Sequence, residues 1–184
     1  MQPQALAQCQ AIAHEVMSNV TADQMELATP CADWNVGQLI DHLVGSQNWG
    51  AAAMQGTEPQ AADGACQGDY CGSFQAAAQA CLDCFNEEGA LEKMVNPGFG
   101  DMPGAAMMGL MMSDTFQHAW DLATATGQDN NLNPEMAAQI LQASQQMIQP
   151  AFRSEEGSIF GMEQQAPEGA NAATQLAAFL GRSV

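Results

Sequence analysis

The chain has 184 residues, and 21 acidic side chains against only 3 basic ones give it a formal net charge of −18. Its cations, Lys93, Arg153 and Arg182, cannot form the basic face that binds nucleic acid or an anionic membrane surface. No apolar run reaches the roughly 18 residues that cross a bilayer, and the N-terminus lacks the basic and apolar regions of a signal peptide. We therefore expect one domain over residues 1–184, located in the cytoplasm, without nucleic-acid or membrane partners.

The first half of the chain shows two helical patterns separated by a connector. Apolar residues recur at helical spacing over residues 3–20 and again over residues 36–54. Asn35 stands where the N-cap of the second helix is expected. Glycine and small residues then dominate residues 56–72, which predicts a long crossover connection.

The second half predicts four more helices. Ser73 is the expected cap of a helix over residues 74–88, and a long apolar segment predicts a helix over 104–126 that Gly127 ends. A further helix is expected from Pro134 to about Gln149, and a short amphipathic helix closes the chain.

Residues 154–169 carry no helical pattern and are expected to form a loop. No segment shows the alternation of a convincing β-strand. The sequence therefore predicts an all-α fold: a four-helix bundle with a long crossover and extra short C-terminal helices.

A candidate metal site comes from three polar residues in these helices. Asp114 and His118 are four apart in the 104–126 segment and so share one helix face. That segment is apolar on two sides, which indicates burial, and a buried Asp or His is costly unless it is paired or metal-bound. His42 in the helix at 36–54 would complete a three-ligand site with an open coordination position, as in catalytic zinc sites. Asp121 is the expected hydrogen-bond partner of a ligating histidine.

Simpler interpretations of the same residues stay open. His42 could be a surface histidine beside a packed Trp49, although Gly45 would leave room next to it. Asp114 and His118 could form a hydrogen-bonded pair that only stabilises the core.

The six cysteines are expected to be reduced thiols, as is usual in the cytoplasm. Cys66, Cys71, Cys81 and Cys84 could be combined into a four-thiolate zinc site. Their spacings are not those of a zinc ribbon, and Cys81 and Cys84 fall inside a helical stripe. We therefore expect neither a disulfide nor a cysteine ligand to the metal.

Several motifs, in order and spacing, resemble the mycothiol-dependent maleylpyruvate isomerase N-terminal domain family, within the wider DinB-like metalloenzyme superfamily. They are Thr29-Pro30-Cys31-x-x-Trp34, His42-Leu43-Val44-Gly45, Asp114-x-x-x-His118-x-Trp120-Asp121-Leu122-Ala123-x-Ala125-Thr126-Gly127 and Leu180-Gly181-Arg182. The resemblance implies a four-helix bundle around a divalent metal, and it carries the ligand roles onto His42, Asp114 and His118. It also implies a low-molecular-weight thiol cofactor such as mycothiol.

Two departures from the family pattern change the expected function. The isomerase has a second, C-terminal domain that we do not expect here, and its acidic ligand is typically Glu where this chain has Asp114. Few cations are present to bind a dianion such as maleylpyruvate. We therefore predict a metal-dependent thiol transferase or isomerase of small uncharged electrophiles, with zinc as the expected metal, although nickel or another divalent ion would also fit. A metal-dependent hydrolase and a non-catalytic metal-binding or ligand-binding helical protein are the alternatives. The expected partners are a small-molecule substrate and a second copy of the chain in a homodimer.

Overall fold

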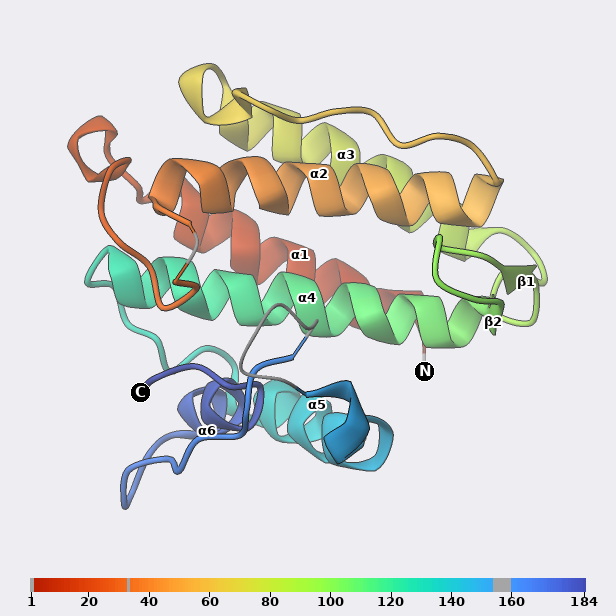
Figure 1. Cartoon of the computed structure of the whole chain (residues 1–184). Helices are drawn as coiled ribbons and strands as arrows, with labels where there is room; N and C mark the ends of the chain where they lie inside the picture. The colour runs from red at the N-terminus through yellow and green to blue at the C-terminus, as the bar shows by residue number, and fades with distance from the viewer. Residues whose placement is uncertain (1, 33, 154–159) are drawn as a thin grey trace.

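The computed structural model describes residues 2–32, 34–153 and 160–184, and it is built almost entirely of helices (Figure 1). The predicted all-α fold is confirmed, with a bundle of four long helices at its centre. The bundle consists of α1 (Pro3–Ser18), α2 (Val36–Gln55), α3 (Tyr70–Asn86) and α4 (Gly104–Ala125). Two further helices, α5 (Pro134–Met147) and α6 (Ala172–Phe179), pack against α4. Within the described residues, no helix has both the length and the apolar character needed to cross a membrane.

A long crossover gives the bundle its topology. Helices α2 and α3 run in the same direction, so the chain returns along the bundle between them, through the short helical turn η2 (Ala65–Gln67) (Figure 1). The carboxylate of Asp41 anchors this return, because its oxygens accept hydrogen bonds from the backbone amides of Gly64 at 2.8 Å and Cys66 at 2.7 Å. Asp41 therefore faces the crossover, and its neighbour His42 is left to face another side of α2.

Helix α2 begins where the sequence predicts. The Asn35 side chain accepts a hydrogen bond from the Gln38 amide, and the Gln38 side chain accepts one from the Asn35 amide. This reciprocal capping satisfies two amides that the helix cannot satisfy itself. Gly56 ends the helix in a left-handed conformation (φ 71°) that glycine adopts without steric cost.

Helix α3 begins earlier than predicted, and Ser73 is not its cap. The helix starts at Tyr70, and the Asp69 side chain accepts a hydrogen bond from the Gly72 amide. The prediction was wrong because glycine at position 72 is unfavourable inside a helix, whereas the Asp69 cap starts the helix before it. The crossover is correspondingly shorter and ends at Asp69.

The remaining elements differ only in detail from the expected ones. A two-stranded antiparallel hairpin, β1 (Met94–Val95) with β2 (Met102–Pro103), lies between α3 and α4. The 3₁₀ turn η1 (Ala22–Gln24) lies between α1 and α2, and the 3₁₀ turn η3 (Pro150–Phe152) lies between α5 and α6. Of the loop expected at 154–169, residues 154–159 lie outside the described part of the chain, and residues 160–169 have no helix or strand.

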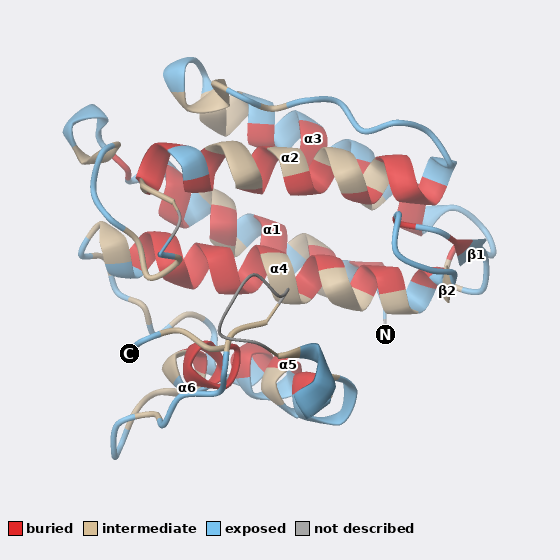
Figure 2. Ribbon diagram, viewed as in Figure 1, coloured by how far each residue is buried: buried red, intermediate tan, exposed pale blue. Residues whose placement is uncertain are grey.

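The core contains two groups of buried apolar side chains, one toward each end of the bundle. Helix α4 contributes to both groups and is buried along most of its length (Figure 2). A buried polar chain also crosses the interior: Gln10 donates to Gln47 at 2.8 Å and to the Ala78 carbonyl at 3.0 Å, and Gln47 donates to Thr115 at 2.9 Å. Because these bonds join all four helices and buried amides need partners, they favour one axial alignment of the bundle.

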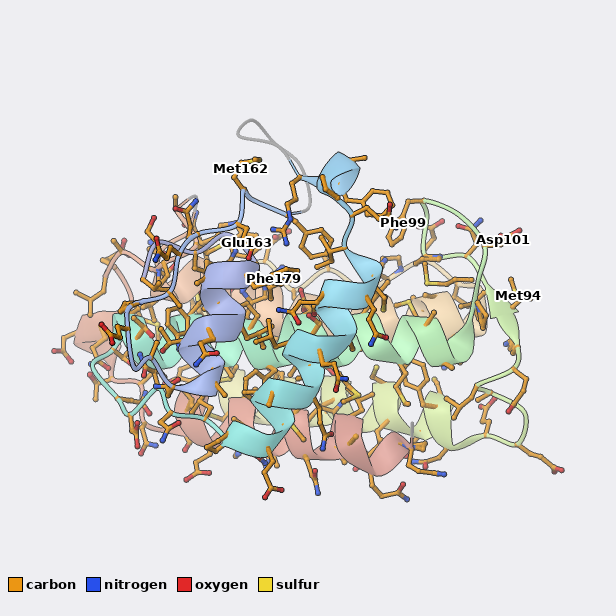
Figure 3. All side chains as sticks on the ribbon, turned by 90° about the horizontal axis from the view of Figure 1, so that it is seen from below. Met94, Phe99, Asp101, Met162, Glu163 and Phe179 are labelled. Atoms are coloured by element: carbon orange, nitrogen blue, oxygen red, sulfur yellow. The ribbon has the colours of Figure 1, made fainter. Side chains whose placement is uncertain are left out.

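The C-terminal helices form a layer over α4, seen face on in Figure 3. Arg153 holds this layer together, since it donates to the carbonyls of Gly161 at 2.9 Å and Phe179 at 2.7 Å. Its guanidinium also lies 4.5 Å from the centre of the Phe179 ring. The layer brings the end of the chain back toward α4.

Candidate metal centre

The structure brings His42, Asp114 and His118 together between α2 and α4. The Nε2 atom of His42 lies 3.2 Å from Oδ1 of Asp114, and Nε2 of His118 lies 3.5 Å from the same oxygen. The ring centroids of the two histidines are 4.5 Å apart. The three side chains form a group whose donor atoms all lie within 4.8 Å of one another. The predicted convergence of these residues is therefore present.

The donor set suits a divalent metal ion. Two imidazole nitrogens and a carboxylate are ligands that zinc and related ions accept. The second carboxylate oxygen of Asp114, Oδ2, is buried and has no hydrogen-bond partner among the described residues. An unpaired buried carboxylate oxygen is costly, and a cation would satisfy it. The site is partly open, since the side chains of His42 and Asp114 are 28% and 29% exposed.

Electrostatics favour a cation at the same place. Burial alone would raise the pKa of the Asp114 carboxyl, but the neighbouring His118 and His42 hold that pKa well below its usual range. Burial likewise opposes the charged form of His118, yet Asp114 and Asp121 raise the pKa of His118 to about 9. Both shifts have the same cause, which is that this part of the bundle favours a positive charge next to the two carboxylates.

Asp121 fixes the orientation of His118, as predicted. Its Oδ2 lies 2.9 Å from Nδ1 of His118, which leaves Nε2 on the side of Asp114 and His42. Asp121 is fully buried, and burial would raise the pKa of its carboxyl, but His118 and Arg182 hold that pKa below its usual range. Arg182 donates hydrogen bonds to both carboxylate oxygens of Asp121. Its Nε lies 2.9 Å from Oδ1 and 3.2 Å from Oδ2, and its Nη2 lies 2.9 Å from Oδ2. The role of Arg182 was not predicted from the sequence.

An aromatic side chain covers the histidines. The Trp34 ring lies 4.4 Å from the ring of His42 and 5.5 Å from that of His118, measured between centroids. The preceding turn is held by Thr29, whose hydroxyl is 2.9 Å from the Trp34 carbonyl and accepts the Cys31 amide at 3.1 Å. In the sequence, Thr29, Cys31 and Trp34 were recognised only as part of a family motif. The structure shows that this motif lies beside the two histidines and forms one wall of the site.

Cys31 creates a second group of possible ligands with His118 and Asp121. Cys31 is thus close enough to be a potential ligand, and the absence of a cysteine ligand stays a prediction. We favour the first group as the metal site because both oxygens of Asp121 are already bonded to Arg182 and His118. By contrast, Asp114 retains a buried oxygen without a described partner.

Gly45 and Trp49 both face segments that pack on α2. A Cβ built on Gly45 would meet the Cβ of Ala62 in the crossover at 3.5 Å, an ordinary van der Waals contact, so this glycine faces the crossover. Trp49 is packed, as expected: its ring nitrogen donates to the Pro97 carbonyl at 3.1 Å, and its ring stacks on Phe99 with centroids 6.3 Å apart. The loop before α4 thus covers this part of α2.

All six cysteines lie in the described part of the chain, and none of them forms a disulfide. Burial raises the pKa of Cys9 and of Cys81 to about 12. The thiols of Cys66 and Cys71 are only half-buried, but burial is still the main cause that raises each pKa. Apart from Cys31, no cysteine joins a described group of three potential ligands.

The fold and this site define a DinB-like helical protein with a candidate metal centre of two histidines and one aspartate. The chain belongs to the family described as the mycothiol maleylpyruvate isomerase N-terminal domain, whose model matches residues 6–123.

The chain is also similar to two proteins of Mycobacterium tuberculosis, from strains CDC 1551 and H37Rv, both named as uncharacterised. Each is 37% identical over 173 residues, which span 92% of this chain and 91% of the relative. No solved structure gives a significant match. The matched length in these relatives includes most of the chain beyond residue 123, where the family model ends.

Proposed function

We propose that this protein binds one divalent metal ion, with zinc as the first choice, through His42, Asp114 and His118. We further propose that it uses a low-molecular-weight thiol to act on a small electrophile, as a transferase or isomerase. The observation that carries the proposal is the convergence of one ligand atom each from His42, Asp114 and His118, together with a buried Oδ2 of Asp114 that has no hydrogen-bond partner among the described residues. Three protein ligands leave room for a small molecule at the ion, which is the pattern of catalytic rather than structural sites.

The residues around the ion would have distinct roles. Asp121 holds the Nδ1 proton of His118, so that Nε2 is the nitrogen left for the metal. Trp34 covers the two imidazole rings and excludes water from that side. When bound, the metal would supply Lewis acidity that lowers the pKa of a coordinated thiol toward neutrality.

The engagement of the three cations supports an uncharged substrate. Lys93 donates to the Met54 carbonyl at the end of α2, at 2.6 Å. Arg153 binds two carbonyls in the C-terminal layer, and Arg182 binds Asp121. Each cation is thus used to hold the fold or the site, and the net charge of −18 opposes an anion further. A buried carboxylate group without a paired cation costs several kcal/mol.

The test combines metal analysis with a thiol panel. Protein loaded with zinc, nickel or cobalt is assayed with several low-molecular-weight thiols, mycothiol among them, against neutral electrophiles and maleylpyruvate. We expect thiol-dependent turnover of a neutral electrophile, lost in His118→Ala and kept in His14→Ala. Equal turnover with and without thiol would replace the proposal by a metal-dependent hydrolase. Stoichiometric metal without any turnover would replace it by a non-catalytic metal-binding protein.

A further inference from the structure

Arg182 reaches the candidate metal centre from outside the region that the family model matches. Helix α6 ends in a specific turn: Gly181 donates to the Ala178 carbonyl at 3.0 Å, and Arg182 donates to the Ala177 carbonyl at 2.9 Å. These two bonds, with Gly181 left-handed at φ 96°, form a Schellman motif. A Cβ on Gly181 would lie 2.7 Å from the Cα of Gly161, so only glycine fits. The turn therefore fixes the direction in which Arg182 leaves α6.

The target of Arg182 is a carboxylate that depends on it. Asp121 is fully buried in α4, where an ionised carboxylate is costly without partners. Arg182 provides paired contacts to Oδ1 and Oδ2, and Gln117 adds a weaker donor at 3.2 Å to Oδ1. The planar guanidinium suits this fork geometry, which a lysine cannot reproduce. Asp121 is thereby held with one oxygen aimed at Nδ1 of His118.

We infer that Arg182 is a positioning residue for the metal centre: it holds Asp121, and Asp121 in turn presents His118 Nε2 toward Asp114 and His42. This inference rests on the proposed metal site. The C-terminal turn is then part of the site, although Asp121 and Arg182 are 61 positions apart in the chain. Partners of this kind typically change metal affinity by about 10–100-fold when they are lost.

The competing arrangement makes the opposite prediction. If the metal were bound by Cys31, His118 and Asp121, Arg182 would compete with it for the Asp121 oxygens. Removal of Arg182 would then strengthen metal binding. The sign of the change in affinity therefore distinguishes the two groups of ligands.

The experiment measures zinc affinity by competition with a chelator, and the visible absorption of the cobalt-substituted protein, in matched variants. Arg182→Met and Asp121→Asn should each weaken zinc binding by about tenfold or more and alter the cobalt spectrum. Arg182→Lys should restore part of the affinity. In the Asp121→Asn background, Arg182→Met should add little, because its effect passes through Asp121. The Asp121→Asn/Arg182→Met double variant also avoids an unpaired buried carboxylate if Arg182→Met folds poorly.

Lys93→Met is the matched control. It removes the same charge, but Lys93 binds the end of α2, about 18 Å along the helix from His42. It should leave both the affinity and the cobalt spectrum unchanged.

Unchanged affinity and spectrum in Arg182→Met would overturn the inference while leaving the proposed site intact. A loss of equal size on the Asp121→Asn background would do the same. Tighter binding would overturn both the inference and the assignment of the metal to His42, Asp114 and His118, because it would favour the Cys31, His118 and Asp121 group. Failure of the wild-type protein to bind zinc or cobalt would overturn both the inference and the proposed function.

Discussion

His42 and Asp114 meet at 3.2 Å across the interface between α2 and α4, although they are 72 positions apart in the chain. His118, one turn from Asp114 on α4, approaches the same carboxylate oxygen at 3.5 Å. Local helix geometry explains the second contact, whereas the first requires that the helices pack in one particular alignment. The buried Gln10, Gln47 and Thr115 chain supports that alignment, since it joins α2 to α4 through Gln47 and Thr115.

Removal of either histidine should abolish stoichiometric metal binding. We expect His42→Ala and His118→Ala to lower zinc affinity by at least about 100-fold, more than the loss of a hydrogen-bond partner of a ligand costs. Elemental analysis of purified protein and competition titrations measure this. His14→Ala is the matched control, because His14 is the third histidine of the chain and lies on α1 away from the group. An equal loss of metal in His14→Ala would contradict the assignment.

The start of α3 provides a test of the cap that the structure identifies. Asp69→Ala should lower the free energy of unfolding by about 1 kcal/mol, because the Gly72 amide loses its acceptor. Ser73→Ala should change it by less than about 0.5 kcal/mol, since Ser73 is an exposed helical residue and not the cap. Urea denaturation followed by circular dichroism measures both. A larger effect at Ser73 than at Asp69 would restore the cap expected from the sequence.

The helices could be predicted from periodicity because α1, α2 and α5 bury apolar positions at helical spacing, and α4 is apolar on two sides. The start of a helix could be predicted where an Asn stands directly before the apolar pattern, as Asn35 does before α2 and Asn133 before α5. Asp69 was missed because Gly72 follows it, and glycine is normally evidence against a helix.

The metal centre could be predicted only in part. Asp114, His118 and Asp121 are related by helix spacing, so the sequence of one helix, α4, is enough to predict that these three side chains lie near one another. The approach of Trp34 and Arg182 depends on tertiary packing of the loop before α2 and of the turn after α6. The sequence does contain a signal for Arg182: a glycine followed by an arginine directly after an apolar helix predicts a Schellman turn with a defined exit direction.

Thiol reactivity should separate the cysteines by burial. Burial raises the pKa of the Cys9 and Cys81 thiols from 9.0 to about 12, so at pH 8 both are almost wholly protonated and unreactive. We expect native protein at pH 8 to leave Cys9 and Cys81 unlabelled by a thiol reagent, with the half-buried Cys66 and Cys71 labelled first. Peptide mapping by mass spectrometry identifies the labelled positions. All six should react after denaturation without a reductant.

The same pKa shifts predict a loss of stability in alkali. A folded-state pKa above the unfolded value leaves stability intact below about pH 9 and lowers it as the pH rises from 9 toward 12. Replacement of Cys9 and Cys81 by alanine should flatten this part of the profile of unfolding free energy against pH. A separate titration of thiols in denatured, unreduced protein tests the reduced state of the cysteines. A count of four or fewer free thiols would contradict that state.

Substrate charge should control the rate. For a pair of electrophiles that differ only in a carboxylate, we expect kcat/KM to be about tenfold or more lower for the anionic member, because the net charge of −18 repels it and all three cations are engaged. Salt separates these two causes. Between about 0.01 M and 1 M ionic strength the screening length falls from roughly 30 to 3 Å, which removes long-range repulsion but not the cost of burying an unpaired carboxylate. The preference for the neutral substrate should therefore shrink with salt and persist in part. A dianionic substrate such as maleylpyruvate that is turned over faster than its neutral analogue at low salt would refute this prediction.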